Sequence, residues 1–195
     1  MKLTGANKAI LLKTLHAVIG TLDPTLQDVR ISKDLKDTFI IRRGGTEIII
    51  QEGRLLNREV LSSGTADGID VAMFLAAIIA RESTFYYCDE HFSYIQSDIE
   101  KRIFGIMLDR LGNNEQLIFT THNTDMLDLN LPKHSYIFLR KQQEDGIYNV
   151  SAISASEVLK RNTDSIRNAV ENDIFASLPQ DSLLDELEMG WANEQ

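Results

Sequence analysis

The chain is 195 residues long and 43% apolar, so it can bury the core of one large domain, with or without an appendage. The longest central apolar run, residues 71–80, is far shorter than the roughly 20 residues that span a bilayer, and the N-terminus lacks a signal-peptide pattern. We therefore expect a cytoplasmic protein with no membrane partner. The net charge of −9 argues against this chain alone wrapping a nucleic-acid backbone, although a larger assembly could still bind nucleic acid.

The N-terminal third predicts a helix followed by short strands. Residues 7–20 carry apolar side chains at helical spacing, and residues 28–32 are typical of a short edge strand. Residues 38–42 and 47–51 flank the pair Gly44-Gly45, which can adopt the positive φ that a tight hairpin turn demands. This pattern predicts a β-hairpin.

The middle of the chain alternates helices with apolar strands. Residues 65–81 predict a helix whose second half is apolar nearly all round, and residues 98–111 predict another. Residues 85–88 and 116–120 predict strands, the first buried on both faces. The single cysteine, Cys88, lies in that strand and cannot form an internal disulfide, so we expect a core residue rather than a reactive thiol.

The succession helix, strand, helix, strand predicts an α/β fold with a mostly parallel sheet, flanking helices and hairpins at the edges. Ligands of such sheets bind at the carboxyl ends of the strands, where Asp89-Glu90 and Thr121-His122 lie. The site should therefore form where these four residues meet.

The C-terminal third predicts a second hairpin around Asp145-Gly146 and two further helices. The spacing of Ser154 and Glu157 is that of a capping box, which would begin the first of these helices. The expected elements are strands at residues 135–140 and 147–153, helices at 154–161 and 164–174, and a poorly ordered acidic tail at 181–195.

An apolar strand that ends in Asp-Glu suits magnesium-assisted nucleotide hydrolysis. The first carboxylate, Asp89, would orient the metal or its water, and the second, Glu90, could polarise an attacking water. The alternative is a strand end that enters a solvated acidic turn, which is common in α/β proteins.

His122 and the segment 62–65 are weaker candidates when taken singly. The imidazole of His122 could bond a terminal phosphate or a water, but a histidine at a strand end is more often a surface residue. A transition-metal cluster of Asp89, His91 and His122 has no supporting ligand spacing. Ser62-Ser63-Gly64-Thr65 opens a helix, so it could bind an anion, although ordinary N-capping by Ser62 or Ser63 explains this motif better when it is taken alone.

Taken together, the three motifs resemble a known family. Residues 61–65, Leu-Ser-Ser-Gly-Thr, resemble the signature motif of ABC-type ATPases, residues 85–90 resemble their Walker B strand, and residues 120–123, Thr-Thr-His-Asn, resemble their switch-histidine loop. The combination of Leu-Ser-Ser-Gly-Thr with Thr-Thr-His-Asn is most similar to the motifs of the RecF, SMC and OLD-like ATP-binding proteins of bacteria. Many of these proteins are linked to DNA repair or phage defence. The resemblance covers about residues 36–160.

The resemblance implies a role for each matched residue. Asp89 would serve Mg²⁺, Glu90 would activate water, and His122 would sense the γ-phosphate of ATP. The signature residues Ser62, Ser63, Gly64 and Thr65 would contact ATP held by a partner protomer, with Ser63 and Gly64 at its γ-phosphate. The loop with Ser93, Gln96 and Ser97 falls where the family's D-loop crosses the dimer interface, although its sequence departs from the usual forms.

The family's phosphate-binding loop is missing from the sequence. No Gly-x-x-x-x-Gly-Lys-Ser/Thr occurs, and the only Lys-Thr pair, Lys13-Thr14, lies in the first predicted helix. The chain therefore resembles the C-terminal lobe of such an ATPase. We expect a helical lead-in at residues 1–35, the lobe at 36–160, a C-terminal helix and tail at 161–195, and a Walker A-bearing lobe supplied by the same gene or a split partner.

Three hypotheses follow. In the first, this is the catalytic half of an ABC-type head that hydrolyses ATP in a head-to-tail homodimer, in phage defence or DNA maintenance. In the second, it is a non-catalytic half-module that assembles with another polypeptide and regulates it. In the third, it is an α/β domain whose acidic pair forms a generic magnesium or phosphate-relay site.

Overall fold

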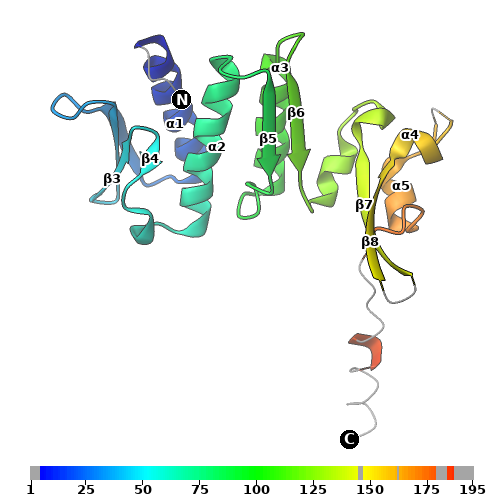
Figure 1. The fold of residues 1–195 in the computed structure, drawn as a ribbon. Coiled ribbons are helices and arrows are strands. Elements are labelled where there is room, and N and C mark those ends of the chain that lie inside the picture. Colours follow the sequence, from blue (N-terminus) through cyan, green and yellow to red (C-terminus); the bar gives the residue numbers. More distant parts are fainter. Residues whose placement is uncertain (1–4, 145–146, 162, 179–183, 187–195) are drawn as a thin grey trace, which may run out of the picture. The chain divides into compact units, whose positions relative to one another are not determined.

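The computed structural model describes residues 5–144, 147–161, 163–178 and 184–186 (Figure 1). The chain forms two compact units, the first ending at Asn123 and the second beginning at Thr124. Helices, antiparallel strands and one parallel pair make this a mixed α/β protein. Among the described residues, no helix combines the length and the apolar character needed to cross a membrane.

The first unit begins with the predicted helix, α1 (Gly5–Leu22), which packs against α2 (Ser63–Ile79). A side chain on Gly68 of α2 would lie 2.6 Å from the Cδ1 atom of Leu22, so this glycine permits the close approach of the two helices. The buried side of α1 consists of Leu11, Thr14, Leu15, Val18 and Ile19. The predicted helix is therefore confirmed, and its apolar side chains pack in the core of this unit.

A four-stranded antiparallel sheet lies beside these helices, in the order β1 (Leu26–Ile31), β2 (Thr38–Arg43), β3 (Thr46–Gln51), β4 (Arg54–Leu55). The predicted edge strand and hairpin are both confirmed, with Gly44 and Gly45 at φ 49° and 86° in the turn. Cross-strand pairing places four fully buried side chains on one face, Phe39 with Ile50 and Ile41 with Ile48. The short β4 was not predicted.

The parallel part of the fold is a single pair of strands, β5 (Phe85–Asp89) and β6 (Gln116–Thr120), joined through α3 (Ser97–Arg110) (Figure 1). The prediction of a mostly parallel sheet is therefore wrong, because most paired strands are antiparallel. The apolar pattern of a strand does not specify the direction of its partner. The helix α3 between β5 and β6 provides the crossover connection that their parallel pairing requires.

The prediction that β5 is buried on both faces is also wrong. Tyr86 meets Phe74 of α2, and Phe119 of β6 meets Phe104 of α3, so both helices cover the same face of the strand pair. On the opposite face, Phe85 and Tyr87 are each 51% exposed. No element among the described residues of this unit buries that face.

The second unit is built on the predicted second hairpin, β7 (Ile137–Glu144) and β8 (Ile147–Ser154). Its turn, residues 145–146, lies outside the described residues, as does the predicted acidic tail except for 184–186. The helices α4 (Ala155–Val158) and α5 (Ile166–Glu171) are shorter than predicted. The capping box is wrong, because Ser154 makes no side-chain cap bond and its hydroxyl instead lies 2.8 Å from that of Ser156.

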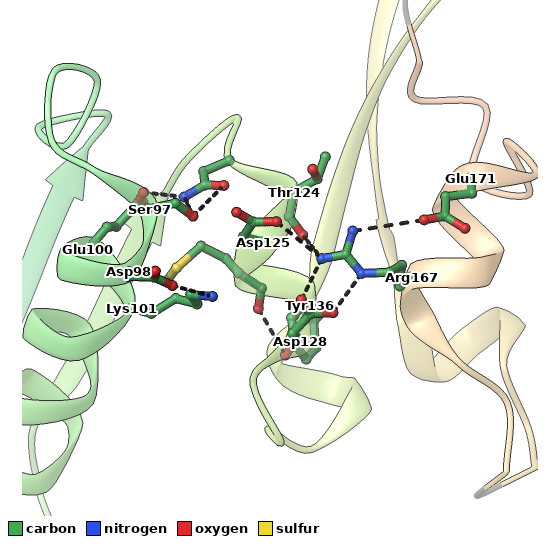
Figure 2. A network of polar contacts seen from close by, with 12 residues as sticks. Ser97, Asp98, Glu100, Lys101, Thr124, Asp125, Asp128, Tyr136, Arg167 and Glu171 are labelled. Atoms are coloured by element: carbon green, nitrogen blue, oxygen red, sulfur yellow. Dashed lines mark hydrogen bonds and ion pairs between the residues drawn. The ribbon is translucent and has the colours of Figure 1, made fainter.

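The core of the second unit lies between the hairpin and α5, where the rings of Phe138 and Phe175 stack with centroids 4.0 Å apart. Two short 3-10 helices, Thr124–Asp128 and Lys133–Ser135, precede β7. Arg167 of α5 bonds both carboxylate oxygens of Asp128, at 2.6 and 2.7 Å, and so ties α5 to the first 3-10 helix (Figure 2).

Shortening a buried side chain of α1 tests the packing of the first unit. Leu15 is fully buried, so Leu15→Ala should lower the free energy of unfolding by about 2–5 kcal/mol through lost burial and the cavity left behind. Urea unfolding followed by circular dichroism measures this, with Lys13→Ala on the exposed side of the same helix as the control. A loss for Leu15→Ala no larger than that of the control would contradict the packing described.

Candidate functional site

The candidate site lies at the carboxyl ends of β5 and β6, which parallel pairing brings to one edge. The Thr120 hydroxyl donates a 2.6 Å hydrogen bond to Oδ1 of Asp89, and the Glu90 amide donates to the Thr120 carbonyl and hydroxyl, both at 3.2 Å. Two segments 30 residues apart are thereby joined at the strand ends. Thr120, the last residue of β6 and the first of the Thr-Thr-His-Asn motif, is the residue that links them.

Glu90 turns the chain out of the strand. Its φ of 52° lies in the left-handed region, which costs a non-glycine residue about 1 kcal/mol or more. The turn is held by Ser93, whose hydroxyl donates a 2.8 Å hydrogen bond to the Glu90 carbonyl. Strain of this kind, held by surrounding bonds, is often found where a side chain must be aimed at a ligand.

A cavity of about 190 Å³ opens beside this turn and contains several of the predicted site residues. Glu90, Ser93 and His122 line it with exposed side chains, and Phe92 and Ile95 form its apolar wall. The structure thus places the predicted water-activating carboxylate and the predicted phosphate-sensing imidazole around one cavity. Asp89 lies on the exposed face of the strand pair, where Thr120 holds it.

Sequence reasoning missed a buried carboxylate in the wall of this cavity. Glu100 of α3 is 2% exposed and accepts hydrogen bonds from the Thr121 hydroxyl at 2.9 Å and the Asn123 amide at 2.5 Å. A signal for it exists in the sequence. Glu100 precedes Ile103 by three residues and Phe104 by four, so it lies on the same core-facing side of α3. An acidic side chain at such a position needs hydrogen-bonding partners.

The signature-like segment begins α2 and behaves as an N-cap. The Ser62 hydroxyl accepts a 3.3 Å hydrogen bond from the Thr65 amide and lies 2.8 Å from the Thr65 hydroxyl, so the capping interpretation holds for Ser62. Ser63 is exposed. A side chain on Gly64 would lie 3.2 Å from the Tyr94 carbonyl oxygen, so this glycine lets α2 approach the loop after β5.

A second cavity, of about 410 Å³, lies at this end of α2. Ser62, Gly64 and Thr65 line it together with Gln96 of the predicted dimer-interface loop. The residues predicted for the dimer interface therefore line different cavities, because Gln96 lines the second whereas Ser93 and Ser97 line the first.

An ion pair also borders the second cavity, where Arg43 contacts Asp23. Burial alone would raise the pKa of Asp23, but hydrogen bonds from Thr25 and the ion pair with Arg43 hold it below its ordinary value. The carboxylate therefore stays charged, and the pair remains intact near neutral pH.

Two other groups of β5 have shifted pKa values. The charge of Asp89 raises the pKa of the Tyr87 hydroxyl, with burial and a hydrogen bond to Asp89 adding to the shift. Burial raises the pKa of the Cys88 thiol to about 12. Among the described residues, no group of three or more His, Cys, Asp or Glu side chains is placed to hold a metal ion, so the cluster of Asp89, His91 and His122 is not formed.

Solved structures similar to this chain are of SMC proteins. They are the SmcHead bound to the C-winged helix domain of ScpA (14% identity, TM-score 0.47), a structure titled for ATP-driven dimerization and DNA-stimulated activation of SMC ATPases (14%, 0.46), and the SMC head domain from Thermotoga maritima (18%, 0.37). The matches cover 77%, 78% and 77% of this chain and 45%, 88% and 52% of those chains. The chain thus spans about half the length of the first and third.

No protein-family model and no curated protein matches the sequence.

Cys88 offers a direct test of the core around β5. Its raised pKa keeps the thiol protonated near neutral pH, and its 1% exposure bars reagents, so disulfide reagents should label the folded chain at least about 100-fold more slowly than the urea-unfolded chain. Because this is the only cysteine in the sequence, the absorbance of the thiolate released by a chromogenic disulfide reagent reports the labelling of one site. Comparable labelling rates in the two states would show that β5 is not packed as described.

Proposed function

We propose that this chain is the C-terminal half of an ABC-type ATPase head, which hydrolyses ATP at a head-to-tail dimer interface once joined to a Walker A-bearing lobe. Residues 36–160 would form the lobe, after a helical lead-in at 1–35 and before a C-terminal helix and tail at 161–195. The observation that carries the proposal is the meeting of Glu90 and His122 at one cavity. Phage defence or DNA maintenance in the cytoplasm, with nucleic acid as a possible partner of the assembly, is the context we propose.

The division of the motifs between two cavities supports the head-to-tail arrangement. Glu90 and His122 line the first cavity, whereas Ser62, Gly64 and Thr65 line the second, and the two cavities share no lining residue. A single copy therefore does not gather both sets around one ligand. Two copies related by a two-fold axis would bring the first set of each copy opposite the second set of the other.

The oxygen donors at the strand ends fit a magnesium ion. Mg²⁺ keeps several waters and takes one or two carboxylates, and Asp89 offers an exposed carboxylate that Thr120 orients through one oxygen. When bound, Mg²⁺ would neutralise charge on the β- and γ-phosphates. Asp89 would hold the ion or its water.

Glu90 and His122 would act on the γ-phosphate side. Glu90, aimed by the left-handed turn, would orient and polarise the attacking water, and His122 would donate a hydrogen bond to the γ-phosphate. In the partner protomer, Ser63 and the α2 N-terminus would contact the same phosphate through hydroxyl and amide groups. Both protomers would then be needed for turnover.

Mixing two inactive variants of the complete protein, meaning this chain joined to the Walker A-bearing lobe, tests this arrangement. Glu90→Gln should abolish turnover yet retain ATP and trap a dimer, and Ser63→Arg should block the opposite side of the site. Mixed dimers would contain one site with both defects and one intact site, so mixing should restore steady-state hydrolysis to at most about a quarter of the wild-type rate. Glu59→Gln, at an exposed glutamate outside both cavities, is the matched control.

Unchanged hydrolysis by Glu90→Gln would remove Glu90 from the mechanism. Two inactive variants whose mixture stays inactive would contradict a site shared between protomers. Assembly of the wild-type chain with the Walker A-bearing lobe but without turnover would favour the non-catalytic half-module.

A further inference from the structure

The buried carboxylate of Glu100 has a position that packing alone does not explain. Its neighbours on the buried side of α3 are Ile103, Phe104 and Met107, so an apolar residue would fit this position of the helix. Burying a charged group costs free energy unless hydrogen bonds replace its lost hydration. Glu100 is 2% exposed, and both of its oxygens accept hydrogen bonds.

Both hydrogen bonds go to the segment that carries His122. Oε1 accepts from the Thr121 hydroxyl at 2.9 Å, and Oε2 accepts from Nδ2 of Asn123 at 2.5 Å. His122 stands between these two residues, so the carboxylate holds the chain on both sides of it. Bonds to an ionised acceptor are among the stronger hydrogen bonds in proteins.

Two further contacts close this network. The Asn123 backbone amide donates to the Thr121 hydroxyl at 3.0 Å, and Nδ2 of Asn123 donates to the Ser97 hydroxyl at 2.9 Å. Ser97 and Glu100 both belong to the first turn of α3, and Figure 2 shows them close to each other there. The start of a rigid helix therefore fixes the loop after β6 at several points.

We propose that Glu100 is a positioning residue, which fixes residues 121–123 so that the His122 side chain stays at the cavity it shares with Glu90. The assignment of a γ-phosphate as the group that His122 meets rests on the proposed function. The restraint itself rests only on the contacts of Glu100 and is testable without ATP.

The test compares three substitutions in the chain as it stands. Glu100→Leu places an apolar residue at this core position of the helix and removes both acceptors, so the urea midpoint should stay within roughly 0.3 M of wild type. Backbone order parameters of residues 121–123, measured by NMR, should fall from about 0.85 to below about 0.6. Glu100→Gln, which can still bond both partners after rotation of the Thr121 hydroxyl, should keep them near the wild-type values, and Asp109→Leu, at an exposed position of α3, is the control.

Unchanged order parameters in Glu100→Leu would overturn the proposal. If that variant instead loses global stability, Thr121→Val decides, since it removes one of the two hydrogen bonds through which Glu100 holds the loop and leaves α3 unchanged. Order parameters that fall at residues 121–123 in Thr121→Val support the proposal, and unchanged ones overturn it.

Hydrolysis by the complete protein gives a separate readout. Glu100→Leu should lower kcat about 10- to 100-fold while KM stays within about threefold, because positioning acts on the reacting geometry, and Glu100→Gln should recover most of the rate. A complete protein without hydrolysis would remove the proposed function, yet the order parameters would still decide the role of Glu100. An equal loss in the Gln and Leu variants would overturn the positioning role.

Discussion

The parallel pairing of β5 with β6 is the constraint on which the candidate site depends. In its register Asp89 lies opposite Thr120, so the two segments that follow the strands leave the sheet at the same edge. The hydrogen bonds from Thr120 to Asp89 and from Glu90 to Thr120 then join the segments. Without this pairing, Glu90 and His122 would be 32 positions apart in sequence with no reason to share a cavity.

The same strand pair is covered on one side only. Helices α2 and α3 pack against the face of Tyr86 and Phe119, while Phe85 and Tyr87 remain half exposed on the other face. A two-stranded sheet is marginal by itself, and parallel sheets are ordinarily covered on both faces. A bare apolar face of this kind is what we expect of a lobe that another lobe completes, and it therefore accords with the proposed function.

Local signals in the sequence predicted most of the elements, because each rests on residues close in the chain. The turn at Gly44-Gly45 and the helical spacing of residues 7–20 are of this kind, and both were confirmed. The direction of strand pairing is not local, so the sequence overestimated the parallel part of the sheet. Ser154 also shows the limit of a short motif, since the neighbouring Ser156 competes for its hydroxyl.

The candidate site was predictable only in part. The strand-end residues Asp89, Glu90 and His122 carry a recognisable pattern, and the structure places them at one edge of the strand pair. Glu100 was missed because an acidic residue in a helix is ordinarily a solvated one, and its burial depends on Thr121 and Asn123 across the fold. Partners of this kind emerge only when distant segments are placed in three dimensions.

Direct titration of this chain with Mg-ATP tests the central claim. The sequence has no phosphate-binding loop, so the half-site account predicts no binding by calorimetry up to high micromolar ATP, and binding only after the Walker A-bearing lobe is added. Tight, magnesium-dependent binding to this chain alone would mean that it holds a complete nucleotide site, and would contradict the account.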